Sequence, residues 1–380
     1  MQKLKNLMKH FFKENGLTYR FTSKLYHLAS TQKYILFHKK EIKQKNKYYS
    51  GVVENAVECI NGFKGKEYIV FYNPTWLGVA ASTKGLFENN VPLEQVFGRK
   101  NIMKIANAVV SSNIKTIIFS QIVDGWTQVI AEIKRMKEDA NIKVIWHGNC
   151  YEFFSDYTWN LNKDVMELCN EGKVDCIGFV RSTMYEFYKS AGFKACYLQN
   201  NVKKEKKEVK DNKDTKIKIG VYNADSRELK NIYTSLSAIK LVKNSIADVV
   251  PINEGAKKFT EILGLEVSST DDYISNENLM QRIQKNEINI YPTFTENAPM
   301  FPLESFEMGV PCLLGNNNDY FVGTELGKFV ILEREDDPLY IKEKIQEAIK
   351  NKKHIMELYY EWKIDFDRKC ERYVKEFIDM

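Results

Sequence analysis

Short apolar runs alternate with segments of helical character along most of this 380-residue chain. The runs at 68–72 and 116–119, for example, are rich in β-branched and aromatic residues, and longer polar stretches separate them. Strands that alternate with helices usually pair in parallel, because a parallel neighbour requires a long crossover connection. The alternation therefore predicts an α/β protein built on parallel sheets.

The apolar runs form two series on either side of a charged stretch, residues 203–216, which reads KKEKKEVKDNKDTK. Such a run is normally a solvated linker, and the chain is long enough for two domains. We expect a basic N-terminal extension, two Rossmann-like domains and a final helix, with the bounds 1–65, 66–205, 213–355 and 356–380. Strands are expected near 68–72, 116–119, 143–146, 176–180, 196–198, 217–221, 247–250, 265–267, 288–290, 312–314 and 329–331.

The composition is that of a water-soluble globular protein, with 44% hydrophobic and 28% charged residues. No stretch approaches the ~20 apolar residues of a membrane span, and the N-terminus lacks the apolar core of a secretory signal. The seven cysteines are scattered and form no CxxC pair. We therefore expect a cytoplasmic protein without a disulfide framework or a zinc site.

Positive charge is concentrated in residues 1–50, which hold twelve Lys and Arg against Glu14 and Glu41, although the whole chain is only +6. Leu7, Met8 and nearby aromatic residues lie among these lysines. One interpretation is a segment that binds an anionic membrane surface on the inner face of the cell membrane. The alternative is a solvated helical extension that packs on the next domain. Nucleic acid is not expected as a partner, because no recognition motif accompanies the charge.

Residues 290–314 read IYPTFTENAPMFPLESFEMGVPCLL. An apolar run ends in a Tyr-Pro pair, a polar loop contains Glu296, and Glu304 lies in the next segment, ahead of Gly-Val-Pro and a second apolar run. The order predicts a strand, a loop, a short helix, a turn and a strand. The seven residues between Glu296 and Glu304 are not specific by themselves, since Glu325 and Glu333 have the same spacing. The specificity of the motif therefore comes from the residues that flank the two glutamates.

The chemistry of this segment suits a sugar nucleotide. Ligands of parallel sheets bind at the carboxyl ends of strands, and a carboxylate such as Glu296 can accept two sugar hydroxyls. We expect the following backbone N–H groups to open the next helix, where phosphate binds favourably. These groups belong to Asn297, Ala298, Met300, Phe301 and Leu303. Glu304 would then lie about two helical turns from Glu296, at ~1.5 Å rise per residue.

The segment resembles the sugar-nucleotide site of the retaining GT-B glycosyltransferases, in particular the bacterial family 4-like group (glycosyl transferases group 1). There the pattern is strand-Tyr-Pro-Ser, Glu, seven residues, Glu-Ala, Gly, Pro, strand. The resemblance spans about residues 66–380. It implies two Rossmann-like domains facing across a cleft, the first for the acceptor and the second for the nucleotide-sugar donor, and a C-terminal helix that crosses back to the first domain. It also implies that Glu296 holds donor-sugar hydroxyls and that Glu304 holds the ribose hydroxyls.

The family places an Arg and, five residues later, a Lys on the donor diphosphate. Counting back from the following helix, Lys230 takes the Lys position, whereas Asp225 stands at the Arg position and Arg227 lies two residues further on. The resemblance thus implies a diphosphate contact from Lys230, with Arg227 as a second candidate. The alternative for both is ordinary surface charge.

Two loops of the first domain are further candidates. His147 follows a strand, beside a Gly, where the family often has a His near the donor diphosphate or the acceptor; a structural histidine is the alternative. Gly78 lies where the family has a Gly-rich phosphate loop, and an ordinary turn is the alternative. Asn201 replaces the Gly of an interdomain turn, since Asn tolerates left-handed geometry.

The resemblance implies transfer of a hexosyl or N-acetylhexosaminyl group from a nucleotide-diphosphate sugar, with UDP the expected nucleotide. The acceptor would be a glycan, a lipid-linked or a protein-linked sugar, in bacterial surface polysaccharide or glycoconjugate assembly. Retention of configuration is expected, with no cofactor and no metal, because no DxD motif follows a first-domain strand. Alternatives are a sugar-nucleotide epimerase, a non-catalytic partner subunit, and a membrane-binding protein that only binds a glycan.

Overall fold

The computed structural model describes residues 39–202, 216–222, 228–272 and 274–380. The basic segment 1–38, the linker 203–215 and Arg227 lie outside this part of the chain. The chain divides into two compact units, residues 1–55 and 56–380. In the first unit the structure describes the beginning of helix α3 (Lys39–Gly62), and both sheets belong to the second unit.

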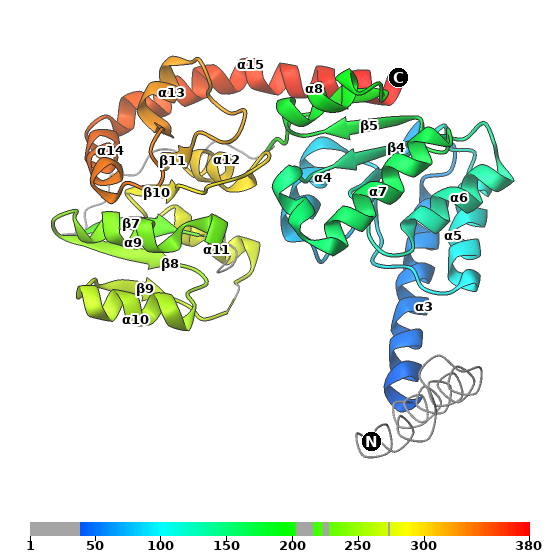
Figure 1. Cartoon of the computed structure of the whole chain (residues 1–380), viewed down its shortest axis with the longest axis horizontal. Helices are drawn as coiled ribbons and strands as arrows, with labels where there is room; N and C mark the ends of the chain where they lie inside the picture. The colour runs from blue at the N-terminus through cyan, green and yellow to red at the C-terminus, as the bar shows by residue number, and fades with distance from the viewer. Residues whose placement is uncertain (1–38, 203–215, 223–227, 273) are drawn as a thin grey trace, which may run out of the picture. The chain divides into compact units, whose positions relative to one another are not determined.

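Two parallel six-stranded sheets form the framework of residues 56–380 (Figure 1). The first has the order β2-β1-β3-β4-β5-β6 and the second the order β12-β11-β10-β7-β8-β9. The strands of the first sheet are β1 (Tyr68–Tyr72), β2 (Asn90–Pro92), β3 (Thr116–Ser120), β4 (Asn141–Trp146), β5 (Cys176–Phe179) and β6 (Ala195–Tyr197). Those of the second are β7 (Ile217–Val221), β8 (Ser245–Val249), β9 (Val267–Ser269), β10 (Ile288–Tyr291), β11 (Cys312–Gly315) and β12 (Ile331–Leu332). The predicted α/β class with parallel sheets is confirmed.

Edge strands account for the errors of the strand prediction. Residues 329–331 were expected to form one strand, but Phe329 and Val330 end helix α13 and the strand β12 begins only at Ile331. The strand near 265–267 starts two residues later, as β9, and the three-residue β2 was not predicted. The central strands are buried along nearly their whole length, as β3, β4, β10 and β11 show. Their runs of apolar residues are therefore longer and easier to recognise than those of edge strands.

Helices connect the strands. In the region of the first sheet they are α4 (Leu77–Leu86), α5 (Arg99–Ser111), α6 (Trp126–Met136), the 3-10 helix η1 (Cys150–Phe154), α7 (Asp156–Asn170) and α8 (Ser182–Ser190). In the second they are η2 (Glu228–Lys230), α9 (Ile232–Lys240), α10 (Glu254–Leu263), α11 (Asn276–Ile283), α12 (Met300–Glu307), α13 (Glu325–Val330) and α14 (Pro338–Lys350), followed by α15 (Lys352–Asp379). Within the described residues, no helix has both the length and the apolar character that a membrane crossing requires. All seven cysteines are free thiols.

Helix α15 contacts β6 and α4 in the region of the first sheet and α13 and α14 in the region of the second (Figure 1). Tyr359 donates a hydrogen bond of 2.8 Å to the Glu307 carboxylate on α12. At the other end, the buried Lys143 ammonium of β4 donates to the carbonyl oxygens of Phe377 and Ile378, at 2.5 and 2.8 Å. The last carbonyls of a helix carry partial negative charge, so they provide a partner for this buried cation. Burial lowers the pKa of Lys143.

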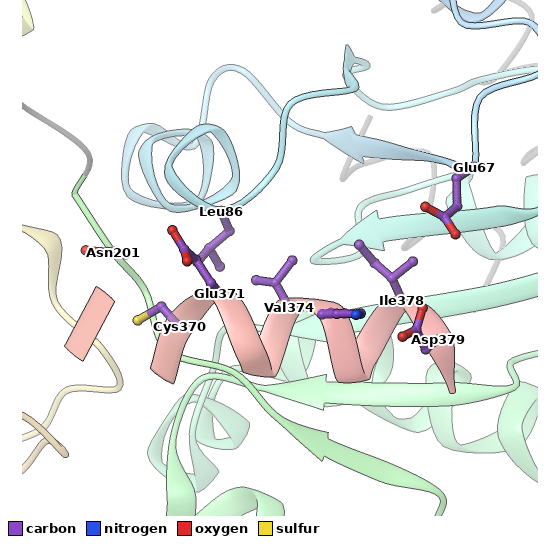
Figure 2. A pocket seen from close by; sticks show the side chains of 9 residues that line it. Glu67, Leu86, Asn201, Cys370, Glu371, Val374, Ile378 and Asp379 are labelled. Carbon is purple, nitrogen blue, oxygen red and sulfur yellow. The ribbon is translucent and has the colours of Figure 1, made fainter. Parts of the chain in front are cut away.

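A cavity of about 360 Å³ lies beside the C-terminal half of α15 (Figure 2). Its walls combine apolar side chains and carboxylates, among them Leu86, Val374, Ile378, Glu67, Glu371 and Asp379. None of the catalytic or donor-binding residues predicted from the sequence lines it. The candidate site lies elsewhere, at the carboxyl ends of the strands.

Candidate functional site

The segment 290–314 folds as the sequence predicts, with β10, a loop, helix α12, a turn and β11. The helix begins at Met300, and Pro299 is its N-cap in an extended conformation. Asn297 and Ala298 therefore lie in the loop, and their N–H groups do not open the helix as expected. Glu296 also lies in the loop, so the expected two-turn helical separation from Glu304 is wrong. Proline at 299 delays the helix, because the residue before a proline is biased away from helical geometry.

Residues around α12 explain why the flanking motif is specific. The Ser305 hydroxyl donates to the carbonyl of Val310 at 2.7 Å and accepts from the Asn289 amide of β10 at 2.7 Å. Gly309 has a φ of 79°, a left-handed conformation that favours glycine, and its N–H bonds to the carbonyl of Phe306. Together these contacts fix α12 between the two central strands.

The Glu296 carboxylate makes two short contacts through one oxygen. Its Oε1 accepts from Lys230 Nζ at 2.5 Å and from the Tyr291 hydroxyl at 2.7 Å. The side chains of Lys230 and Glu296 are only 8% and 13% exposed. Lys230 also donates to the Tyr291 hydroxyl at 3.0 Å. Among the described residues, no group donates to Glu296 Oε2, so this second oxygen can accept a ligand hydroxyl.

Lys230 is positioned by the residue that follows it. Asn231 is the N-cap of α9 and adopts a left-handed conformation with φ 54°. Its side-chain amide donates to the carbonyls of Pro292 and Glu335, at 2.8 and 2.6 Å. These bonds hold the end of β10 beside η2, so the Lys230 side chain lies against Tyr291. The structure thus brings Lys230 and Glu296 together.

Glu304, the fifth residue of α12, is 8% exposed. A carboxylate this deeply buried is uncommon, because desolvation of its charge is costly without polar partners. Met300 and Phe301 form the first turn of the same helix, and their N–H groups lack partners within it. Arg227 and Asp225 lie outside the described residues.

His147 lies at the carboxyl end of β4, in the first sheet. Its Nε2 is 2.9 Å from the Ser120 hydroxyl of β3, which is 2.6 Å from the Thr83 hydroxyl of α4. Thr83 in turn donates to the carbonyl of Val79 at 2.7 Å. Because the Thr83 proton is used there, Thr83 accepts from Ser120, and Ser120 accepts from His147. This order places the imidazole proton on Nε2 and leaves Nδ1 as an acceptor.

Burial lowers the pKa of His147 to about 4. The ring is therefore neutral at pH 7, and it can accept a hydrogen bond without carrying charge. Its backbone N–H donates to the Gln121 side chain at 2.8 Å, and Gln121 itself has a left-handed φ of 67°. The loop after β3 thus fixes the loop after β4.

Two first-sheet residues that sequence reasoning did not assign, Asn149 and Arg181, hold the Glu296 loop. The Asn149 amide donates to the Thr295 hydroxyl at 3.0 Å and to the carbonyl of Glu296 at 3.3 Å. The Arg181 guanidinium, just after β5, donates to the carbonyls of Glu296 and Asn317. Both follow strands of the first sheet, as His147 does, so their position at carboxyl ends was the available signal.

Gly78 lies within helix α4 and not in the loop before it. Gly78 is the second residue of α4, and a Cβ there would meet nothing within 4 Å, so packing does not require glycine at that position. A Cβ at Gly85 would instead lie 2.2 Å from the carbonyl oxygen of Asn201. Asn201 is not among the described residues with positive φ, so the expected left-handed turn there is wrong. Its side chain donates to Asp367 of α15 at 2.8 Å.

Unsatisfied polar atoms gather around the Glu296 loop. Nine buried side-chain polar atoms in the described residues have no hydrogen-bond partner, and four of them belong to Trp146, Thr293, Asn297 and Asn317. These residues lie in or beside the loops that carry His147 and Glu296. Buried polar groups are normally paired, so these four atoms can form hydrogen bonds with water or a polar ligand.

Several solved structures of sugar-transferring proteins resemble this chain. A trehalose-6-phosphate synthase (OtsA) matches with a TM-score of 0.53 and 9% identity, over 83% of this chain and 98% of its own. A sucrose-phosphate synthase from Thermosynechococcus elongatus matches with 0.52 and 11%, over 77% and 84%. The lipopolysaccharide outer core galactosyltransferase WaaB matches with 0.51 and 10%, over 77% and 93%. The sequence matches no protein-family model and no curated protein. At these identities the likeness establishes the fold alone, which is the GT-B fold.

Proposed function

We propose that this GT-B chain transfers a sugar from a nucleotide-diphosphate sugar to an acceptor hydroxyl. The observation that carries the proposal is the Glu296 carboxylate, which Lys230 and Tyr291 hold through Oε1, while no group of the described residues donates to Oε2. A fixed carboxylate with one open oxygen suits a sugar hydroxyl, and the adjacent ammonium suits a diphosphate. The fold supports the reaction class, since the solved structures that share it act on sugars.

In the proposed reaction the bond between the anomeric carbon and the diphosphate breaks, and a bond to the acceptor oxygen forms. The acceptor proton passes to the departing diphosphate. Negative charge grows on the leaving group, and Lys230 and the first turn of α12 can stabilise it electrostatically. Glu296 orients the donor sugar, and Glu304 holds the ribose hydroxyls.

The neutral His147 ring is proposed to orient a sugar hydroxyl through Nδ1, because Nε2 is committed to Ser120. A group with a pKa of about 4 would be a weak base at pH 7. Its role is therefore positioning of a substrate hydroxyl. The side chains of Asn149 and Arg181, which donate to the Glu296 loop, would keep this ring close to it.

Finer parts of the proposal concern substrate and outcome. The donor is UDP-linked, the transferred group is a hexosyl or N-acetylhexosaminyl unit, and configuration is retained by attack on the face that the diphosphate leaves. The acceptor belongs to bacterial surface polysaccharide or glycoconjugate assembly. The motif context of residues 290–314 supports these assignments, and NMR of the product anomer tests retention.

The primary test is a nucleotide-sugar screen on the full chain. A donor is identified by a rise in melting temperature, and its hydrolysis is then measured with and without acceptor extract. Glu296→Gln should reduce turnover strongly, whereas Glu325→Gln and Glu333→Gln, two exposed carboxylates with the same spacing, should leave it unchanged. The donor assignment would be overturned if no nucleotide sugar stabilised the protein.

The transfer activity should survive excess EDTA. A loss of activity that manganese restores would overturn metal independence.

A further inference from the structure

We propose that Tyr151, Phe154 and Trp159 form an aromatic platform on which a carbohydrate acceptor stacks. This inference rests on the proposed function, since it names the class of acceptor for the same site. The three residues lie on η1 and the first turn of α7, immediately after the strand that carries His147.

The platform exposes an unusual amount of aromatic surface. Phe154 is 87% exposed, the highest value among the exposed large hydrophobic side chains of the described residues, and Tyr151 and Trp159 are 47% and 48% exposed. The rings form two neighbouring pairs: Tyr151 and Phe154 have centroids 5.7 Å apart, and Trp159 lies 5.8 Å from Phe153, the residue before Phe154. A cluster of exposed aromatic rings is costly in water unless it serves binding.

The platform is tied to the loop that carries Glu296. Asn149 caps η1 by accepting the N–H of Tyr151 at 2.9 Å, and the same side chain donates to Thr295 and to the carbonyl of Glu296. The next turn is tied as well, because the Glu152 carboxylate accepts from the Asn297 amide at 3.4 Å. The platform therefore belongs to a segment that is hydrogen-bonded to the loop carrying Glu296.

The charge of the segment favours a carbohydrate over a lipid surface. Residues 150–160 read CYEFFSDYTWN and contain Glu152 and Asp156 but no lysine or arginine. Carboxylates accept hydrogen bonds from sugar hydroxyls, and the C–H faces of pyranose rings pack on aromatic rings. An anionic membrane would be repelled by these carboxylates, since basic residues drive binding to such surfaces.

The test compares Phe154→Ala, Phe154→Leu and Trp159→Ala with Phe187→Ala, which removes a 59% exposed aromatic ring from α8. The probes are an array of neutral oligosaccharides of three to six sugars and anionic phosphatidylglycerol vesicles, each with the full-length protein. The first three variants should reduce oligosaccharide binding at least ten-fold, with Leu as harmful as Ala because it lacks an aromatic face. Phe187→Ala should bind like wild type. All four should keep the wild-type melting temperature.

Unchanged oligosaccharide binding by the platform variants would overturn the inference. Wild-type oligosaccharide binding by Phe154→Leu would also overturn it. A loss of vesicle binding alone in the platform variants would do the same, since either result would indicate a lipid surface. Failure of the proposed function is distinguishable from these results. In that case no nucleotide sugar is hydrolysed or transferred, although platform-dependent oligosaccharide binding persists.

Discussion

The polar clusters at the ends of β10 and β4 differ in charge. Lys230 and Glu296 form a short ion pair that is largely buried, whereas His147, Ser120 and Thr83 form a chain of neutral groups. Both clusters lie at the carboxyl ends of central strands, where parallel sheets present ligand-binding loops. The difference matches the two proposed ligands, since a diphosphate requires compensating charge and an acceptor hydroxyl does not. Activity should therefore require both the charge of the Lys230–Glu296 pair and the neutrality of the His147 cluster.

The largest effect is expected from Lys230→Met, which leaves the Glu296 carboxylate without its cation. Removal of one partner of a buried ion pair typically costs about 3–5 kcal/mol of folding free energy. Urea unfolding should show this loss, together with loss of donor hydrolysis. The double variant Lys230→Met/Glu296→Gln should recover much of the stability but none of the activity. Wild-type stability in the single variant would show that the pair is not buried in solution.

Glu296→Gln should reduce turnover about 10²–10³-fold, the size typical of losing one preorganised electrostatic contact. Glutamine keeps an acceptor for Lys230 and Tyr291, so we expect nucleotide affinity to change little. Steady-state kinetics and calorimetric titration with the nucleotide separate the two quantities. A variant with normal turnover would remove Glu296 from the reaction.

Glu304→Gln should weaken nucleotide binding by ~1.5–3 kcal/mol, the range of a hydrogen bond to a charged group. Turnover at saturating donor should change less than in Glu296→Gln, because the ribose is remote from the reacting carbon. Calorimetric titration measures the affinity, with Glu333→Gln as the control. Equal affinity in the variant and wild type would contradict the ribose contact.

The smallest effect concerns pH and the neutral cluster. The pKa of His147 is about 4 in the folded chain and ~6.5 when unfolded, so the unfolded chain binds more protons between these values. Folding stability from this group should therefore fall as pH is lowered from 6.5 towards 4. Urea unfolding at pH 7 and pH 5 should show wild type losing about 1 kcal/mol more than His147→Gln. This loss is smaller than the ~1.4 kcal/mol per pH unit of a full proton difference, because His147 is of intermediate exposure and solvent screens its charge. An equal loss in both proteins would mean that His147 is protonated normally.

The chain by itself determined the α/β class, most central strands and the strand–loop–helix–strand order of residues 290–314. These features follow from local periodicity and from apolar runs that must be buried on both faces. It also singled out Lys230, Glu296 and His147, whose positions after strands mark the binding edge of a sheet. Edge strands such as β12 were predicted less well, because short and partly exposed runs carry a weaker pattern.

Only the tertiary structure decided which side chains meet. The bond from Asn231 to Pro292 sets Lys230 beside Tyr291, and 61 residues separate the two partners in sequence. The Thr83–Ser120–His147 chain joins three elements, and its order alone fixes the tautomer of the imidazole. The need for glycine at Gly85 rather than Gly78 depends on the backbone of Asn201. Each of these facts depends on distances between residues remote in sequence, whereas periodicity reports only which face of an element is buried.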